Sequence, residues 1–189
     1  VFLSLIGISW LGFFGSIFLT SFTGFAKTVI GGAESVVTLL LALFSIGIGV
    51  GSLLCEKLSG SKVEIGLVPF GSIGMTVFAV DLYFASRGLQ PGDAIGAMAL
   101  ITEWKYIRVM IDLFLLALFG GLFSVPLYAL IQHRCEPAYR ARIIAANNIL
   151  GAIFMVAASI MAAALAMAGF SLPQIFLVTG ILNALVAIY

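Results

Sequence analysis

Residues 143–189 read IIAANNILGAIFMVAASIMAAALAMAGFSLPQIFLVTGILNALVAIY and contain no Asp, Glu, Lys or Arg. As one helix this run would be about 70 Å long, whereas the hydrocarbon core of a bilayer is only about 30 Å thick. The run must therefore fold back once, and the sequence GFSLP at 169–173 supplies the break. This stretch predicts two antiparallel membrane-spanning helices.

Four other stretches are equally free of charge, namely 1–26, 35–55, 65–80 and 113–133. Hydrophobic residues make up 62% of the chain and charged residues 9%, against about 25% charged in soluble domains. A soluble protein of this size has too large a surface to hide so much apolar side chain. The net charge of +1 does not bear on nucleic-acid binding, and the sequence has no basic patch large enough to suggest nucleic acid as a partner.

The length and spacing of these stretches predict an all-α, polytopic membrane protein with six transmembrane helices. Each helix approaches the ~20 residues that a span requires, and the runs lack the alternation of barrel strands. The chain begins at Val1 and stops at Tyr189 within an apolar run, so we expect an internal piece of a longer protein. The predicted helices cover about 3–24, 34–56, 63–85, 108–132, 142–168 and 172–189.

The basic residues of the connecting loops predict the orientation, because cytoplasmic loops carry an excess of Lys and Arg. Five basic residues lie near the second–third and fourth–fifth connections, against four on the opposite side. We therefore expect these two connections and both chain ends to be cytoplasmic. Cys55 and Cys135, near the same ends, are expected to be reduced thiols.

Glycine and proline residues predict close packing in one helix and a kink in another. Gly47 and Gly51 form a GxxxG pattern, which is typical of closely packed membrane helices. Gly120, Gly121 and Pro126 predict a loosened or kinked helix. Such a break is either static or part of a cavity-lining transporter helix.

The sequence contains no metal-ligating cluster and no nucleotide-binding loop, and His133 is the single histidine. We therefore expect no cofactor and no enzymatic activity in this segment. The charged residues within the helices are stronger signals, since an intramembrane acid costs about 2.5–3.5 kcal/mol.

Asp112 follows Arg108 by four residues on one helical face, so the two can pair. An interfacial role without function is the alternative for Asp112, and more strongly for Asp81. The amides of Asn147 and Asn148 either join helices or face a cavity.

The segment GSLLCEKLSGSK at 51–62 resembles the loop signature of the major facilitator superfamily. In that family a glycine ends one helix, and an acid and basic residues follow in a tight cytoplasmic loop. Gly51, Glu56, Lys57 and Lys62 would fill these positions here. Glu56 replaces the usual Asp, and the spacing is longer by one residue.

The segments VPLYALIQ at 125–132 and RIIAANN at 142–148 resemble the tenth and eleventh helices of bacterial lysophospholipid transporters. The similarity is to the form fused to an acyltransferase and an acyl-carrier-protein synthetase, and it covers nearly the whole chain as helices seven to twelve. It implies that residues 1–189 form the C-terminal half of a transporter whose two halves alternate around a central site. Its first, second, fourth and fifth helices would face the cavity.

The resemblance implies movement of lysophospholipid, of the ethanolamine kind, to the cytoplasmic leaflet of a bacterial inner membrane for re-acylation. The implied partners are membrane lipids, the N-terminal half and a fused or associated acyltransferase. Asp112 and Arg108 would hold the headgroup. Trp10, Phe13 and Phe14 would lie along the acyl tail, with helix packing as the alternative role of these aromatic residues. Two other interpretations remain open, namely a facilitator for drugs or small molecules and a membrane anchor for the acyltransferase.

Overall fold

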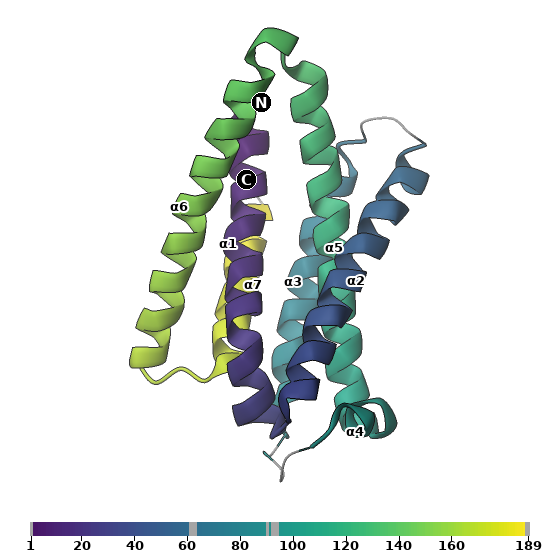
Figure 1. Cartoon of the computed structure of the whole chain (residues 1–189), viewed down its shortest axis with the longest axis vertical. Helices are drawn as coiled ribbons and strands as arrows, with labels where there is room; N and C mark the ends of the chain where they lie inside the picture. The colour runs from purple at the N-terminus through teal and green to yellow at the C-terminus, as the bar shows by residue number, and fades with distance from the viewer. Residues whose placement is uncertain (1, 61–63, 90, 92–94, 188–189) are drawn as a thin grey trace.

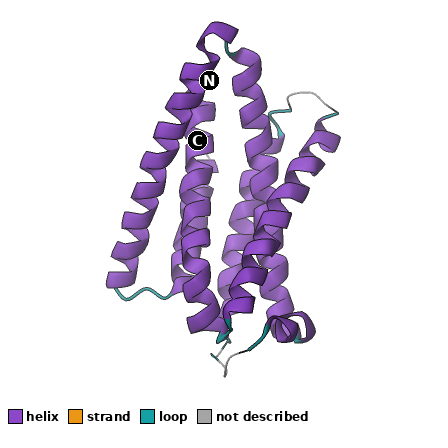
Figure 2. Ribbon diagram, in the orientation of Figure 1, coloured by secondary structure: helices purple, strands orange, loops and turns teal. Residues whose placement is uncertain are grey.

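The computed structural model describes residues 2–60, 64–89, 91 and 95–187, and within these residues the chain is a bundle of helices with no strand (Figure 2). The first helix, α1, continues without a break into a short π-helix. The elements are α1 (Phe2–Phe25), η1 (Ala26–Ile30), α2 (Glu34–Ser59), α3 (Leu67–Ser86), α4 (Ala97–Thr102), α5 (Trp104–Arg134), the 3-10 helix η2 (Pro137–Tyr139), α6 (Arg140–Met167) and α7 (Leu172–Ala187).

The six predicted helices are confirmed as α1, α2, α3, α5, α6 and α7. Five spans are long and apolar enough to cross a bilayer, with η1 and η2 extending the first and last of them. The described part of α7 has 16 residues, about 24 Å, which is shorter than a bilayer core. The chain is therefore a multi-pass membrane protein.

The short helix α4 was not predicted, because its 6 residues are too few to show a helical period. The segment before it is fixed to the junction between α1 and α2 by two backbone hydrogen bonds. The Ala33 N–H donates to the Ile95 carbonyl over 2.9 Å, and the Ile95 N–H donates to the Gly31 carbonyl over 3.0 Å. Gly31 adopts a left-handed conformation with φ of 74°, which a glycine accepts without strain.

The helices form two groups that meet along the length of the bundle (Figure 1). In one group α5 packs extensively against both α2 and α3, and in the other α1 packs against α6. In the view of Figure 1, α3 and α7 lie behind, and they also pack together. Buried phenylalanines of α1 form much of the core, and Phe18 stacks on Phe176 of α7 with ring centroids 4.5 Å apart.

The C-terminal ends of α2 and α5 lie at the same end of the bundle as the start of α1, whereas α4 and the α6–α7 turn lie at the other (Figure 1). The two connections that were predicted to share one side of the membrane therefore do so. Which side is cytoplasmic stays a prediction from the Lys and Arg distribution.

The GxxxG pattern of α2 packs directly on α5, as predicted. A Cβ atom added to Gly47 would lie 2.6 Å from the Phe114 carbonyl oxygen, and one added to Gly51 would overlap the Leu118 backbone. From the opposite side, a Cβ atom on Gly121 would lie 2.6 Å from the Ile48 carbonyl oxygen. The two backbones are therefore close enough that only glycine fits at these positions.

Candidate functional site

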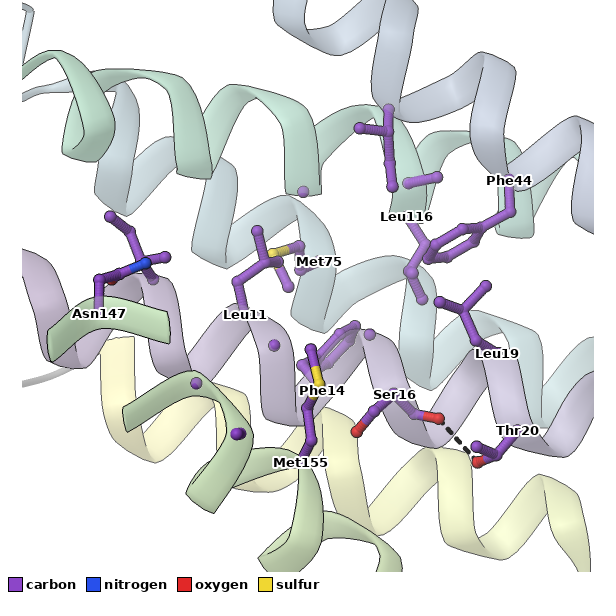
Figure 3. A pocket seen from close by; sticks show the side chains of 18 of the residues that line it. Leu11, Phe14, Ser16, Leu19, Thr20, Phe44, Met75, Leu116, Asn147 and Met155 are labelled. Carbon is purple, nitrogen blue, oxygen red and sulfur yellow. Dashed lines mark hydrogen bonds between the residues drawn. The ribbon is translucent and has the colours of Figure 1, made fainter. Parts of the chain in front are cut away.

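A cavity of about 570 Å³ lies between α1, α2, α5 and α6 (Figure 3). Its size falls within the about 300–1,000 Å³ of small-molecule sites. The walls are mainly apolar, with Leu11 and Phe14 from α1, Phe44 from α2, Leu116 from α5 and Met155 from α6. The adjacent helix α3 contributes Met75.

The cavity is elongated along the bundle. Its lining residues on α1 run from Ile8 to Thr20, a rise of about 18 Å. One leaflet of a bilayer core is about 15 Å deep, half of the full thickness. The cavity is therefore about as long as one leaflet.

The two ends of the cavity differ in their free polar groups. At one end the Ser16 hydroxyl donates to the Phe13 carbonyl over 2.9 Å, and the Thr20 hydroxyl donates to the Ser16 carbonyl over 2.7 Å. These hydroxyls are thus satisfied by their own helix. Asn147 lies at the other end (Figure 3), and the lining also includes the next residue, Asn148, and Tyr128 of α5.

The side-chain oxygen of Asn147 is buried and accepts no hydrogen bond within the described part of the chain. A buried amide oxygen without a donor costs about 1–3 kcal/mol. The polar group that is free to bind a ligand therefore lies at the end of the cavity that is formed by the first turns of α6 and the last turns of α5.

The predicted substrate-contacting residues divide between this cavity and other places. Phe14, Asn147 and Asn148 line the cavity. Trp10 does not line it, because its indole turns toward α7 and donates a hydrogen bond of 2.8 Å to the Asn183 side-chain oxygen. The Trp10 ring also stacks on Phe13, with centroids 4.9 Å apart, so its contacts are those of a packing residue.

Arg108 and Asp112 form part of a separate charged cluster between α3 and α5. The predicted pairing of these two residues is wrong, because Arg108 pairs with Asp81 of α3. The Arg108 Nε donates to Asp81 Oδ2 over 3.3 Å, and a second guanidinium nitrogen donates to Asp81 Oδ1. The interhelical pair with Asp81 is favoured over the pair with Asp112 because the planar guanidinium can make two parallel hydrogen bonds to the Asp81 carboxylate.

Asp112 lies one turn deeper on α5, next to this pair. Its side chain is 2% exposed, and its Oδ2 atom has no hydrogen-bond partner among the described residues. The Asp81 carboxyl is its neighbour on α3. Neither Asp112 nor Arg108 lines the cavity.

The residues of the expected loop signature lie on α2 rather than in a loop. Gly51 is within the helix, packed against α5, and Gly60 ends the helix with φ of 55° and its N–H directed to the Glu56 and Lys57 carbonyls. Glu56 and Lys57 are exposed on the last turn of α2. Lys62 lies outside the described residues. The helix therefore continues past the position where the family pattern would end it.

Sequence reasoning missed the pairing of Asp81 and the role of Asn183. The pairing of Asp81 with Arg108 could have been predicted from the depth of each charge in the membrane. Asp81 lies five residues before the end of α3 and Arg108 four residues after the start of α5, about 7 and 6 Å from the same end of the bundle. Asn183 gave no local signal, because its partners are more than 100 residues away.

No family model, curated protein or solved structure matches this chain. The class of protein follows from the helices themselves, which define a multi-pass membrane protein with a mostly apolar cavity between them.

Proposed function

We propose that this chain is one six-helix half of an alternating-access transporter for a single-chain amphiphile, with lysophospholipid as the substrate class. The elongated cavity with amides at one end carries the proposal. Its apolar length suits one acyl chain of about a leaflet's depth, and Asn147 and Asn148 offer donors and acceptors for a headgroup.

The orientation gives the proposal a direction. The amide end of the cavity lies toward the α5–α6 connection, which the basic residues Arg134, Arg140 and Arg142 assign to the cytoplasmic side. A bound lysophospholipid would have its headgroup at this end, ready for release to the cytoplasmic leaflet. The resemblance of residues 125–132 and 142–148 to segments of bacterial lysophospholipid transporters points to the same substrate class and to a bacterial inner membrane.

The cavity-lining helices support alternating access in a physical way. Helices α1, α2, α5 and α6 share one face of the bundle (Figure 1), where a second half would meet them in a facilitator-type fold. The cavity would then be closed by that half, with α3 and α7 on the far side. The headgroup role expected for Arg108 passes to the amides, since Arg108 is already bound to Asp81.

The test is to fill the cavity in the full-length protein and measure uptake of fluorescent lysophosphatidylethanolamine into proteoliposomes. Gly15 and Gly151 line the cavity, and no atom lies within 4 Å of a Cβ placed on either. Gly15→Leu and Gly151→Leu should each reduce uptake at least tenfold without loss of folded protein. Gly49→Leu is the matched control, because Gly49 has equal space but lies outside the cavity.

Equal uptake in all three variants would contradict the proposal. Uptake of a soluble dye instead of lysophospholipid, blocked by the same two variants, would favour a drug-type facilitator. A protein that moves neither solute would leave the anchor interpretation as the better one.

A further inference from the structure

The Asp112 carboxyl is buried outside the transport cavity, and an ionised form of it would need a compensating charge or hydrogen-bond donor. An ionised carboxylate within a bilayer costs several kcal/mol unless a cation or hydrogen-bond donors compensate it. Asp112 is 2% exposed, and its Oδ2 atom has no donor in the part of the chain that the structure describes. Either a cation or a proton must neutralise this group.

Among the residues that the structure describes, the cation beside Asp112 is Arg108, and it is already paired. Arg108 directs two nitrogens at the two oxygens of Asp81, so one positive charge faces two carboxyls. The remaining carboxyl is balanced if it carries a proton. A protonated Asp112 also has an O–H group, which the neighbouring Asp81 carboxylate is placed to accept.

Within the described part of the chain, the charges that act on Asp112 come from Arg108 and Asp81. α5 itself presents Arg108, and α3 presents Asp81. Residues 2–25 of α1, residues 35–54 of α2 and the whole of α4 contain no charged or titratable side chain. The cluster therefore consists of two carboxyls and one guanidinium.

We propose that Asp112 is a proton-binding site that decides whether Arg108 pairs across to α3 or along α5. With the proton bound to a carboxyl oxygen of Asp112, Arg108 stays on Asp81 and ties the two helices together. When that O–H bond breaks and the proton passes to water, the Asp112 carboxylate competes for Arg108. Arg108 lies four residues before Asp112, one turn away on the same helix, so a side-chain movement suffices.

Asp81 connects the site to the surface of the helix bundle. Its side chain is 37% exposed and that of Arg108 is 52% exposed, whereas Asp112 lies behind them. A proton leaving Asp112 can therefore pass by Asp81 to the outer surface. Asp81 lies five residues before the end of α3, near the expected membrane surface, so it can remain ionised without Arg108.

The packing of α3 on α5 indicates which part of the helix pair would respond. At the other end of the interface, a Cβ atom on Gly71 would lie 2.7 Å from the Phe123 backbone nitrogen, so these backbones are fixed close together. The Arg108–Asp81 pair joins the helices at the opposite end. Loss of the Arg108–Asp81 pair would release this end of the two helices while the glycine contact stays in place. This release would add a proton-dependent step to the transport cycle, and that consequence rests on the proposed function.

The site is testable without transport, by pH-difference infrared spectroscopy on the full-length protein in bilayers of phosphatidylethanolamine and phosphatidylglycerol. The parent protein should show a protonated-carboxyl band that is lost on raising the pH from mildly acid to mildly alkaline. Asp112→Asn should abolish this band, and Asp81→Asn should also reduce it strongly, because the freed Arg108 pairs with Asp112. Glu103→Gln is the control, since Glu103 pairs with Lys105 at 3.0 Å outside the cluster and should leave the band intact.

A second readout follows the helices. Spin labels at the exposed positions 84 on α3 and 111 on α5, with Cys55 and Cys135 replaced by alanine, should move apart by a few ångström as the pH rises. Asp112→Asn, a mimic of the protonated acid, should hold them at the short distance throughout. A band that persists in Asp112→Asn, a parent protein without such a band, or an equal pH response of the distance in Asp112→Asn would overturn the proposal. If the band behaves as expected but no lysophospholipid moves, the proposed function fails and the proton site stands.

Discussion

The indole N–H of Trp10 donates a hydrogen bond of 2.8 Å to the side-chain oxygen of Asn183, which joins the first helix of the bundle to the last. The Asn183 amide nitrogen in turn donates to the Ser72 carbonyl over 2.9 Å and lies 3.0 Å from the Thr76 hydroxyl on α3. Asn183 is completely buried. One side chain thus fixes the mutual position of α1, α3 and α7.

Replacement of Asn183 should therefore be costly. Asn183→Leu leaves the Trp10 N–H without its acceptor, whereas the Ser72 carbonyl keeps a hydrogen bond of 3.1 Å from the Thr76 hydroxyl. We therefore expect a loss of about 1–3 kcal/mol from the unsatisfied indole N–H. Thermal unfolding of the purified protein in detergent would measure the loss. Asn148→Leu is the matched control, because that amide is exposed in the cavity, and it should leave the unfolding temperature nearly unchanged. An equal effect of both substitutions would show that the network adds no stability.

The amides at the end of the cavity should contribute to headgroup recognition. We expect Asn147→Leu to weaken binding of lysophosphatidylethanolamine about tenfold, since about 1–1.5 kcal/mol is typical for a lost hydrogen bond. Binding of a fatty alcohol of equal chain length should change far less. Competition between the two ligands on purified protein provides the measurement, and a parallel loss for both would assign Asn147 to packing.

The contact between α2 and α5 should be too close to accommodate even the one additional methyl group of an alanine at position 51. At Gly51 the new Cβ atom overlaps the Leu118 backbone, which cannot move aside as a flexible side chain can. We expect Gly51→Ala to destabilise the protein by about 1–3 kcal/mol, as overpacking does. Gly49→Ala, two residues earlier with open space around it, should be neutral or slightly stabilising because alanine favours helix. Comparable unfolding temperatures for the two variants would contradict the close packing.

The topology of the bundle is testable with single cysteines. Both native thiols are buried, so they would resist an impermeant reagent from either side, and exposed positions are needed instead. Ala138→Cys lies beyond α5 and Phe170→Cys lies between α6 and α7, at opposite ends of the bundle. In a background without Cys55 and Cys135, we expect only the cysteine at position 170 to react in intact cells. The reverse result would invert the orientation.

The sequence predicted the helices well because charge-free runs of about twenty residues leave few alternatives in a membrane. It also predicted Gly47 and Gly51 as packing residues, since the reason for a GxxxG pattern is local. It failed where the partner is distant in the chain. Trp10 looked like a residue facing a substrate, but its orientation depends on Asn183, and Arg108 looked paired within its own helix, but its partner comes from α3.

The pairing of Arg108 with Asp81 also bears on how the protein is made. A charged side chain adds up to about 2.5–3.5 kcal/mol to the insertion of an isolated helix, the full cost applying at its centre, and the first nine residues of α5 carry Lys105, Arg108 and Asp112. Because α3 leaves the ribosome before α5, the carboxylate of Asp81 is already present when Arg108 arrives. The entry of α5 into the lipid is thereby coupled to the prior arrival of α3, so the two would be integrated as a hairpin rather than one at a time.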